Sequence, residues 1–426
     1  MGAFFKMIEL VILTLFSENI GKSIIYKLKK TKKILVQYKE LRICIYILLL
    51  PIFLICEFLV VCIKIILVWI LSSKRYGDIK YMAHQAYQDK TKLHLSVKKI
   101  YVRCKLLNEL FTKGAEKKVS YGEKNPDIIF YVIRPYYFLT PNALILNNVA
   151  NLLTQYYYCL QKLSYAIEKG YVPIIDWENY GKMPHSEDFP IYNTMNSWEY
   201  YWNQPCQYNL DEVYKSKNVI LSTQNIGQFG YIPNCAMVPP LNKYANEISK
   251  RCPKYAQYIP LNCETRKYVE KYYERLFPKN KLVLGVVVRG SSYGFHKTQF
   301  SSHPTQISIE ELIEEVKKYL SEWNYEYFFF MNEVKELVDK MKEEFGDKVI
   351  ILPRLRDSLY RNTDEKKNPM YKSGNKFQTN LDYITEVALL SKCDSLLGSM
   401  SSGTRTAIIW NNQKYTHIHI FDKGLW

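Results

Sequence analysis

The sequence lacks the short motifs that identify several common classes of protein. Its 10 cysteines include no Cys-x-x-Cys pair and follow no regular spacing, which excludes the usual zinc-binding arrangements. No Asn-x-Ser/Thr sequon occurs in its 426 residues, which disfavours a secreted or Golgi-luminal protein. Scattered, unpaired thiols favour a reducing compartment.

Acidic residues are scarce relative to basic ones. Lys and Arg number 58 against 41 Asp and Glu, a formal net charge of +17, and much of the excess lies in residues 1–42. A basic segment beside an apolar one favours an anionic membrane surface. Nucleic acid is the competing partner of a basic chain, but the sequence has no zinc-finger spacing or RNA-binding signature, so we expect no nucleic-acid partner.

Residues 43–72 are nearly all apolar, with Pro51, Glu57 and Lys64 as interruptions. This length predicts a membrane helix, since about 20 apolar residues span a bilayer; the alternative is a buried helix of a soluble domain. The more basic flank precedes the segment, which places the N-terminus in the cytoplasm. A single span then puts the rest of the chain outside (a type II protein), whereas a re-entrant segment bent at Pro51 keeps it inside. The thiols and missing sequons favour the second arrangement.

The remaining chain has the composition of a folded protein, with 48% apolar and 15% aromatic residues. Residues 1–42 are expected to form a basic amphipathic region, 43–72 the membrane segment and 73–120 a helical connector. Two α/β domains then follow, at 121–280 and 281–426.

The first of these domains begins with a strand–helix–strand pattern. Apolar runs at 128–133 and 171–176 flank a helical stretch at 147–168, which predicts a βαβ unit and a parallel sheet. Residues 178–210 are aromatic and loop-like, and 211–280 are expected to be mostly helical.

The second domain alternates strands and helices throughout. Strands are predicted at 282–288, 327–331 and 349–352, with helices at 309–323 and 334–345. A basic loop at 354–380 is followed by a helix at 381–392, a short apolar strand and a Ser/Gly loop. Ligands of open α/β sheets bind beyond the carboxyl ends of the strands.

That Ser/Gly loop is a candidate phosphate site. Ser401, Ser402, Gly403 and Thr404 stand between an apolar strand and a second apolar run. Small residues in this position expose backbone N–H groups at a helix N-terminus, which favours an anion. The alternative is a plain Ser/Gly turn.

Arg289 is the second candidate, because it follows a predicted strand directly and precedes Gly290 and Ser291. A guanidinium there can bind a diphosphate through two hydrogen bonds, and glycine permits close approach of the backbone. The alternative is an arginine in a structural ion pair.

Other strand ends carry further candidates. Asn332 could contact a nucleoside or cap the next helix, and Asp382, predicted to open the 381–392 helix, could contact a base or ribose or be an ordinary first-turn carboxylate. His296 and His303, in the loop after Arg289, are candidate acids or bases. His417 and His419 alternate without a third ligand, so no metal site is expected.

These residues together resemble the fucosyltransferase superfamily. The resemblance rests on Gly285-Val-Val-Val-Arg289, His303-Pro304, Asn332-Glu333, and Asp382 followed by Leu389-Leu-Ser-Lys-Cys-Asp394 and Ser401-Ser402. The superfamily includes nodulation and core α1,6-fucosyltransferases, with protein O-fucosyltransferases as more distant members. The aromatic block Asn196 to Pro205 resembles bacterial surface-polysaccharide glycosyltransferases.

The resemblance implies a GT-B-like α/β fold in which two Rossmann-like domains face a cleft. It implies a membrane-associated, inverting, metal-independent enzyme of polysaccharide biosynthesis that transfers fucose or a similar sugar from a GDP-sugar to a glycan or glycolipid acceptor. GDP-fucose is then a substrate and no cofactor is required. Arg289 matches the arginine on the donor diphosphate, Asp382 the carboxylate on the nucleoside side, and Ser401 and Ser402 the phosphate loop.

Four positions depart from the pattern of the core enzymes. Val287 replaces a histidine, Gly290 a second arginine and Ser292 an acidic residue, while Asn332-Glu333 replaces an acidic pair. No catalytic base therefore carries over. The alternative function is a non-catalytic, membrane-attached protein that binds a nucleotide or glycan on a glycosyltransferase scaffold.

Overall fold

The computed structural model describes most of the chain after residue 117. The described residues are 118–135, 151–179, 185–222, 231–233, 237, 239–290, 304–357 and 374–424. They belong to one compact unit, formed by Ala115–Tyr137 and Val149–Trp426. The predicted basic region, the membrane segment and nearly all of the connector lie outside the described ranges. Within those ranges, no helix has both the length and the apolar character needed to cross a membrane.

A four-stranded sheet is built from the first part of this unit. Its strands are β1 (Lys118–Val119), β4 (Ser216–Leu221), β2 (Lys124–Ile133) and β3 (Val172–Ile175), in that spatial order. β2 pairs in parallel with both β3 and β4, and β1 adds an antiparallel edge. The predicted βαβ unit is confirmed, since α5 (Leu152–Glu168) connects β2 to the parallel β3.

The second sheet has five strands, all parallel. Their spatial order is β7 (Val349–Ile350), β6 (Tyr327–Met331), β5 (Val283–Val287), β8 (Ser395–Ser399) and β9 (Ile418–Phe421). Counted along the chain this is 3-2-1-4-5, the order of a doubly wound sheet. The direction of winding reverses between β5 and β8, so a crevice is expected beyond their carboxyl ends.

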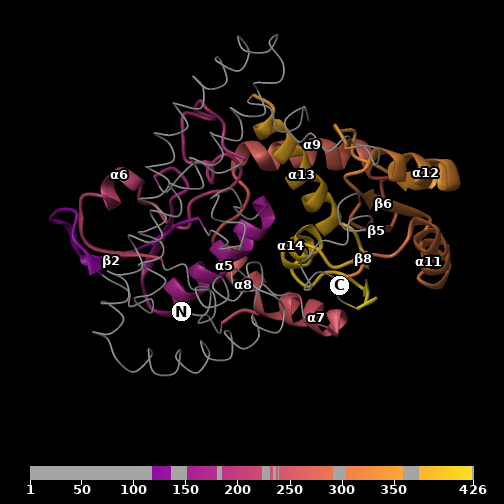
Figure 1. Ribbon diagram of the computed structural model, residues 1–426, viewed down its shortest axis with the longest axis horizontal. Helices are drawn as coiled ribbons and strands as arrows, with labels where there is room; N and C mark the ends of the chain where they lie inside the picture. Colours follow the sequence, from indigo (N-terminus) through magenta and orange to yellow (C-terminus); the bar gives the residue numbers. More distant parts are fainter. Residues whose placement is uncertain are drawn as a thin grey trace, which may run out of the picture. The chain divides into compact units, whose positions relative to one another are not determined.

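Helices cover both sheets. The remaining described helices are α6 (Leu210–Val213), α7 (Leu241–Arg251), α8 (Pro253–Ala256), α9 (Cys263–Leu276), α11 (Ile309–Glu322), α12 (Lys335–Phe345), the 3-10 turn η2 (Gly346–Lys348), α13 (Lys376–Ser391) and α14 (Ser402–Asn411). α14 lies beside α5, α7 and α13 (Figure 1). The helix that follows the Ser/Gly loop is thereby packed against helices from the first half of the unit.

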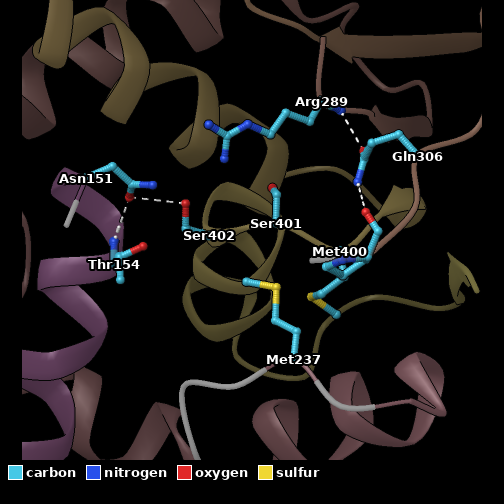
Figure 2. A pocket seen from close by; sticks show the side chains of 9 residues that line it. Asn151, Thr154, Met237, Arg289, Gln306, Met400, Ser401 and Ser402 are labelled. Atoms are coloured by element: carbon cyan, nitrogen blue, oxygen red, sulfur yellow. Dashed lines mark hydrogen bonds between the residues drawn. The ribbon is translucent and has the colours of Figure 1, made fainter. Parts of the chain in front are cut away.

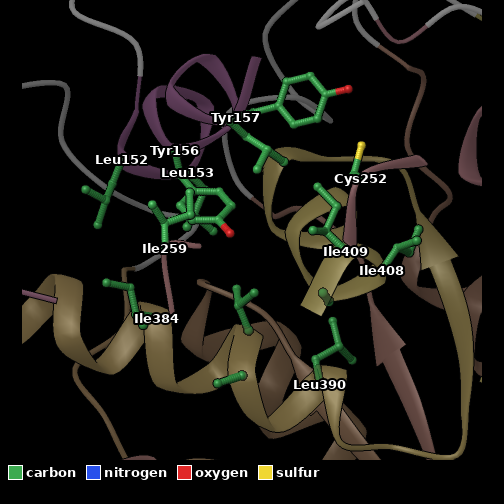
Figure 3. Packing of buried hydrophobic residues seen from close by; sticks show 14 of the residues in the cluster. Leu152, Leu153, Tyr156, Tyr157, Cys252, Ile259, Ile384, Leu390, Ile408 and Ile409 are labelled. Carbon is green, nitrogen blue, oxygen red and sulfur yellow. The ribbon is translucent and has the colours of Figure 1, made fainter. Parts of the chain in front are cut away.

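The second sheet is buried on both faces, as a doubly wound fold requires. Along β5, Val283 and Val287 join the core that α13 and α14 cover, whereas Leu284 and Val286 join the core under α11 and α12. The first of these cores continues into α5, where Tyr156 packs in the same cluster (Figure 3). Burying one such aliphatic side chain contributes about 1.5–3 kcal/mol, so this continuous core fixes α5 and α14 against each other.

Three segments differ from the sequence prediction. Lys118–Val119, at the end of the predicted helical connector 73–120, is the strand β1, because it pairs with β4. Ser216–Leu221 is the strand β4, although residues 211–280 were predicted to be mostly helical; only its last three residues are apolar, and neighbouring strands supply its pairing. α13 begins at Lys376, five residues before the predicted start, so Asp382 lies in the second turn and does not open the helix.

Candidate functional site

The predicted phosphate loop is the N-terminus of α14. Ser401 is the N-cap, and its Oγ accepts the Thr404 backbone N–H at 3.1 Å. The Thr404 hydroxyl is buried and donates to the Ser399 carbonyl at 2.7 Å. The backbone N–H groups of Ser402 and Gly403, in the first turn, have no carbonyl partner within the helix. They lie at the positive end of the helix dipole, where exposed N–H groups favour the binding of an anion.

Arg289 lies two residues beyond β5, which ends at Val287. Its backbone N–H donates to Gln306 Oε1 at 3.1 Å, while its side chain is about one-third exposed, with Nε 3.8 Å from Glu333 Oε1. The ion pair is long and both side chains are about one-third exposed, so the guanidinium is accessible to an anionic ligand. The local structure therefore accommodates both the binding role and the ion pair that the sequence left open.

Gly290 is required by a close approach of the chain to the end of β6. A Cβ added there would lie 2.3 Å from Val334 Cγ2 and 3.0 Å from Asn332 Oδ1. The Gly290 backbone N–H donates to Glu333 Oε1 at 3.0 Å. Glu333 thus holds the turn that carries Arg289.

A pocket of about 60 Å³ joins Arg289 to the phosphate loop (Figure 2). It lies where the winding of the second sheet reverses, beyond the carboxyl ends of β5 and β8. Its lining is formed by residues from both halves of the unit: Asn151, Thr154, Met237, Arg289, Pro304, Gln306, Met400, Ser401 and Ser402.

Asn151 enters the site from outside the second sheet, and sequence reasoning missed it. It is the N-cap of α5, and its Oδ1 accepts both the Thr154 backbone N–H at 2.9 Å and the Ser402 hydroxyl at 3.2 Å (Figure 2). The available signal was an asparagine directly before the apolar stripe that starts at Leu152, but the helix was predicted to begin at residue 147, which put Asn151 inside it. Such an asparagine marks a cap but does not show that the cap faces α14.

The predicted nucleoside-side residues make specific internal contacts. The Asn332 side chain is buried, donating to the Val288 carbonyl at 2.9 Å and accepting the Val334 N–H at 2.8 Å. Asp382 Oδ1 accepts the Tyr268 hydroxyl at 2.9 Å and Gln378 Nε2 at 2.7 Å. Burial raises the pKa of Asp382. Asn332 thus links the segment after β5 to the segment after β6. Asp382 is half-buried, and its Oδ2 takes no part in the two hydrogen bonds to Oδ1.

Two arginines with buried side chains, Arg354 and Arg356, lie in the segment that follows β7. Arg354 Nη2 lies 2.7 Å from Glu386 Oε2, and Arg356 Nη2 lies 2.9 Å from Glu386 Oε1. All three side chains are at most 7% exposed. Arg354 is also close enough for its charge to act on Asp382 and Glu333. Sequence reasoning placed both arginines in a basic loop and missed this cluster.

Three of the predicted site residues are outside the described ranges: Ser291, His296 and His303. The ring of His417 stacks on that of Trp323, with centroids 4.9 Å apart, and the ring of His419 packs on that of Tyr319, with centroids 5.0 Å apart. Among the residues described, no group of three or more His, Cys, Asp or Glu side chains is placed to hold a metal ion.

Solved structures similar to this chain include fucosyltransferase NodZ from Bradyrhizobium, at 15% identity over 70% of this chain and 98% of that one, with a TM-score of 0.39. POFUT1 in complex with GDP-fucose is 11% identical over 70% of this chain and 99% of that one, with a TM-score of 0.37. A variant of Arabidopsis thaliana FUT1 in complex with GDP is 12% identical over 68% of this chain and 70% of that one, with a TM-score of 0.34. No protein-family model and no curated protein matches the chain.

Proposed function

We propose that this protein is a glycosyltransferase that transfers fucose or a similar sugar from a GDP-sugar to a glycan or glycolipid acceptor. One observation carries the proposal: Arg289 and the N-terminus of α14 line the same pocket at the switch point of a doubly wound sheet. A guanidinium and free backbone N–H groups are the groups that bind a diphosphate. The choice of a GDP-sugar over other nucleotide sugars is supported by the resemblance of the sequence motifs to the fucosyltransferase superfamily.

The proposed chemistry is the departure of a nucleoside diphosphate as the acceptor attacks the anomeric carbon, with inversion. Negative charge then develops on the diphosphate, and Arg289 with the first turn of α14 can stabilise it by charge-assisted hydrogen bonds. These groups provide a positive potential without a metal ion, so the proposal includes metal-independent turnover. His296 and His303 remain the candidate bases.

The GT-B-like arrangement is part of the same proposal. Asn151, at the start of α5, reaches the pocket from the half of the unit that contains the first sheet. The acceptor is therefore proposed to bind on that side, within the predicted domain 121–280, and the donor on the side of 281–426.

Membrane attachment through residues 43–72, with the catalytic part on the cytoplasmic side, is proposed on the sequence alone. Its test is fractionation of the full chain, with and without residues 1–72, combined with protease accessibility in sealed vesicles. Recovery of the full chain in the soluble fraction would reject attachment, and protection of the catalytic part inside the vesicle lumen would reject the cytoplasmic orientation.

The function is tested with GDP-fucose, GDP-mannose and UDP-sugars, each incubated with the full chain in EDTA. Calorimetry with GDP measures binding, and released nucleotide measures turnover with a panel of glycan acceptors. We expect GDP to bind and GDP-fucose to turn over equally well with and without EDTA. Absence of binding by every nucleotide would overturn the proposal, whereas binding without turnover would assign the non-catalytic alternative.

A further inference from the structure

Glu333 lies just beyond β6 with one carboxylate oxygen engaged and the other open. Its Oε1 accepts the Gly290 backbone N–H at 3.0 Å and lies 3.8 Å from Arg289 Nε. Among the residues that the structure describes, no hydrogen bond or ion pair is formed by Oε2. The side chain is 34% exposed, so the carboxylate is accessible to a ligand that also contacts Arg289.

The backbone of Glu333 is held firmly in this position. Its carbonyl accepts the Asp357 N–H at 2.8 Å, and the Asp357 carbonyl accepts the Lys335 N–H at 2.9 Å. The preceding residue, Asn332, is 1% exposed and uses its amide to hold the strand ends together. Glu333 is therefore the side chain of this pair that a ligand can reach, and it is carried by a backbone that is fixed before the ligand binds.

The distance from Glu333 to Arg289 indicates which part of a nucleotide the carboxylate meets. A carboxylate repels phosphate groups and accepts hydrogen bonds from hydroxyl groups. In a nucleoside diphosphate the ribose is bonded to the diphosphate, whereas the base lies one ring further away. With Oε1 only 3.8 Å from the Nε of the arginine proposed to hold the diphosphate, the ribose hydroxyls are the donors within reach of Oε2.

The topology of the second sheet leads to the same assignment. In the doubly wound sheets that bind dinucleotides, the turn after the first strand contacts phosphate, and a carboxylate near the end of the second strand accepts a ribose hydroxyl. Here β5 is the first strand, β6 is its parallel neighbour and the second, and Glu333 follows β6.

Asp382 extends this order toward the base. The charge of the buried Arg354 acts on both Glu333 and Asp382, so the two carboxylates lie around the same guanidinium. Asp382 is the residue that the sequence motifs match to the nucleoside side. From Arg289 through Glu333 to Asp382, the side chains then follow the order of diphosphate, ribose and base in the nucleotide.

We propose that Glu333 binds the ribose of the donor nucleotide, with Oε2 accepting a hydrogen bond from its 2′- or 3′-hydroxyl while Oε1 holds the turn at Gly290. The inference rests on the proposed function, because it assumes that Arg289 and α14 hold a nucleoside diphosphate. It adds to that function a requirement for a ribonucleotide and a residue that enforces it.

The first test changes the ligand and leaves the protein intact. Calorimetry compares the binding of GDP and of 2′,3′-dideoxy-GDP to the full chain. The wild type should bind GDP about tenfold more tightly, the effect of one hydrogen bond to a charged group. Equal affinities would overturn the inference, because a nucleotide held only by its diphosphate and base does not need the hydroxyls.

Glu333→Gln assigns the difference to this residue. The Gly290 N–H can only donate, so the amide oxygen takes the place of Oε1 and the amide nitrogen that of Oε2. The variant thus keeps the turn and loses the acceptor. GDP should bind about three- to tenfold more weakly, and dideoxy-GDP within about twofold of its wild-type affinity. Equal changes for the two nucleotides would show that Glu333 acts only through the turn, and would overturn the inference.

Glu326→Gln is the matched control, at the amino end of β6. Glu326 is 51% exposed and pairs with Lys281 at 2.7 Å, so its replacement should leave both affinities unchanged; a selective loss of GDP binding there would also overturn the inference. If Glu333→Gln does not fold, Glu333→Asp replaces it, because a side chain shorter by one methylene withdraws the acceptor and should give the same selective loss. Failure of the wild type to bind any nucleotide overturns the proposed function, whereas GDP binding without preference over dideoxy-GDP overturns this inference alone.

Discussion

The side-chain carboxylate of Glu187 accepts the backbone N–H of Phe377 at 2.8 Å, across 190 positions of the sequence. Its other oxygen accepts the Gly374 N–H, also at 2.8 Å. α13 has no side-chain cap of its own and no acidic residue in its first turn. Glu187 therefore supplies both the cap and the negative charge that a helix N-terminus favours. A residue between β3 and β4 of the first sheet thus determines where the helix carrying Asp382 and Glu386 begins.

Replacement of Glu187 by Ala should lower the free energy of unfolding by about 1–3 kcal/mol, because two backbone N–H groups lose their acceptor. Urea denaturation measures the change. Glu187→Gln, which keeps one acceptor oxygen, should lose less. The assignment of Glu187 as the cap of α13 fails if the Ala variant unfolds at the wild-type midpoint.

Replacement of Arg289 by Ala should weaken GDP binding by about 2–4 kcal/mol, since it removes charge-assisted hydrogen bonds to the diphosphate. Calorimetry measures the affinity. Arg251→Ala is the charge-matched control, because Arg251 is 40% exposed and lies 3.9 Å from Glu247 on the same helix. If both variants bind GDP as the wild type does, Arg289 does not hold the donor.

Replacement of Glu386 by Gln should lower the free energy of unfolding by about 3–5 kcal/mol. The change leaves the buried guanidinium groups of Arg354 and Arg356 without the carboxylate that both contact, and an uncompensated buried charge is costly. The control is Glu270→Gln. Glu270 pairs with Lys392 at 2.9 Å but is 45% exposed, so the loss there should be below about 1 kcal/mol. If urea denaturation gives similar losses for Glu386→Gln and Glu270→Gln, Glu386 does not stabilise the fold through a buried ion-pair cluster.

His185 should make the fold sensitive to mild acid. It is buried against Trp177, with ring centroids 5.2 Å apart. Burial, and then the charge of Lys376, lowers its pKa to about 3. Between that value and the ordinary pKa of about 6.5, the unfolded chain binds a proton that the folded chain does not, so stability is lost as the pH falls below about 6.5.

From pH 7 to pH 5 the wild type should therefore lose about 2 kcal/mol more than His185→Phe, a variant that keeps a ring against Trp177 and cannot titrate. Urea denaturation of both proteins at the two pH values gives the difference. Parallel losses would show that folding does not lower the pKa of His185.

Local patterns were sufficient for much of the second sheet. Tyr327–Met331 was predicted with the bounds that β6 has, because consecutive apolar and aromatic residues indicate a strand buried on both faces. Ser216–Leu221 was missed because its first half is polar, and its pairing with β1 and β2 comes from residues far away in the chain. The start of α13 was missed because its cap is Glu187, a distant residue.

The sequence by itself determined that Arg289 comes just after a strand and that Ser401 precedes a helix, because apolar runs, glycine and small hydroxyl residues act over a few neighbouring positions. Only the tertiary structure decided that these two residues share one pocket with Asn151, and that Glu386 lies between Arg354 and Arg356. Those contacts depend on the order of strands in the sheet and on a core shared by α5, α13 and α14. Strand order and shared burial join residues that are 30 positions apart, as Arg356 and Glu386 are, or 251, as Asn151 and Ser402 are. Local patterning carries no information over such separations.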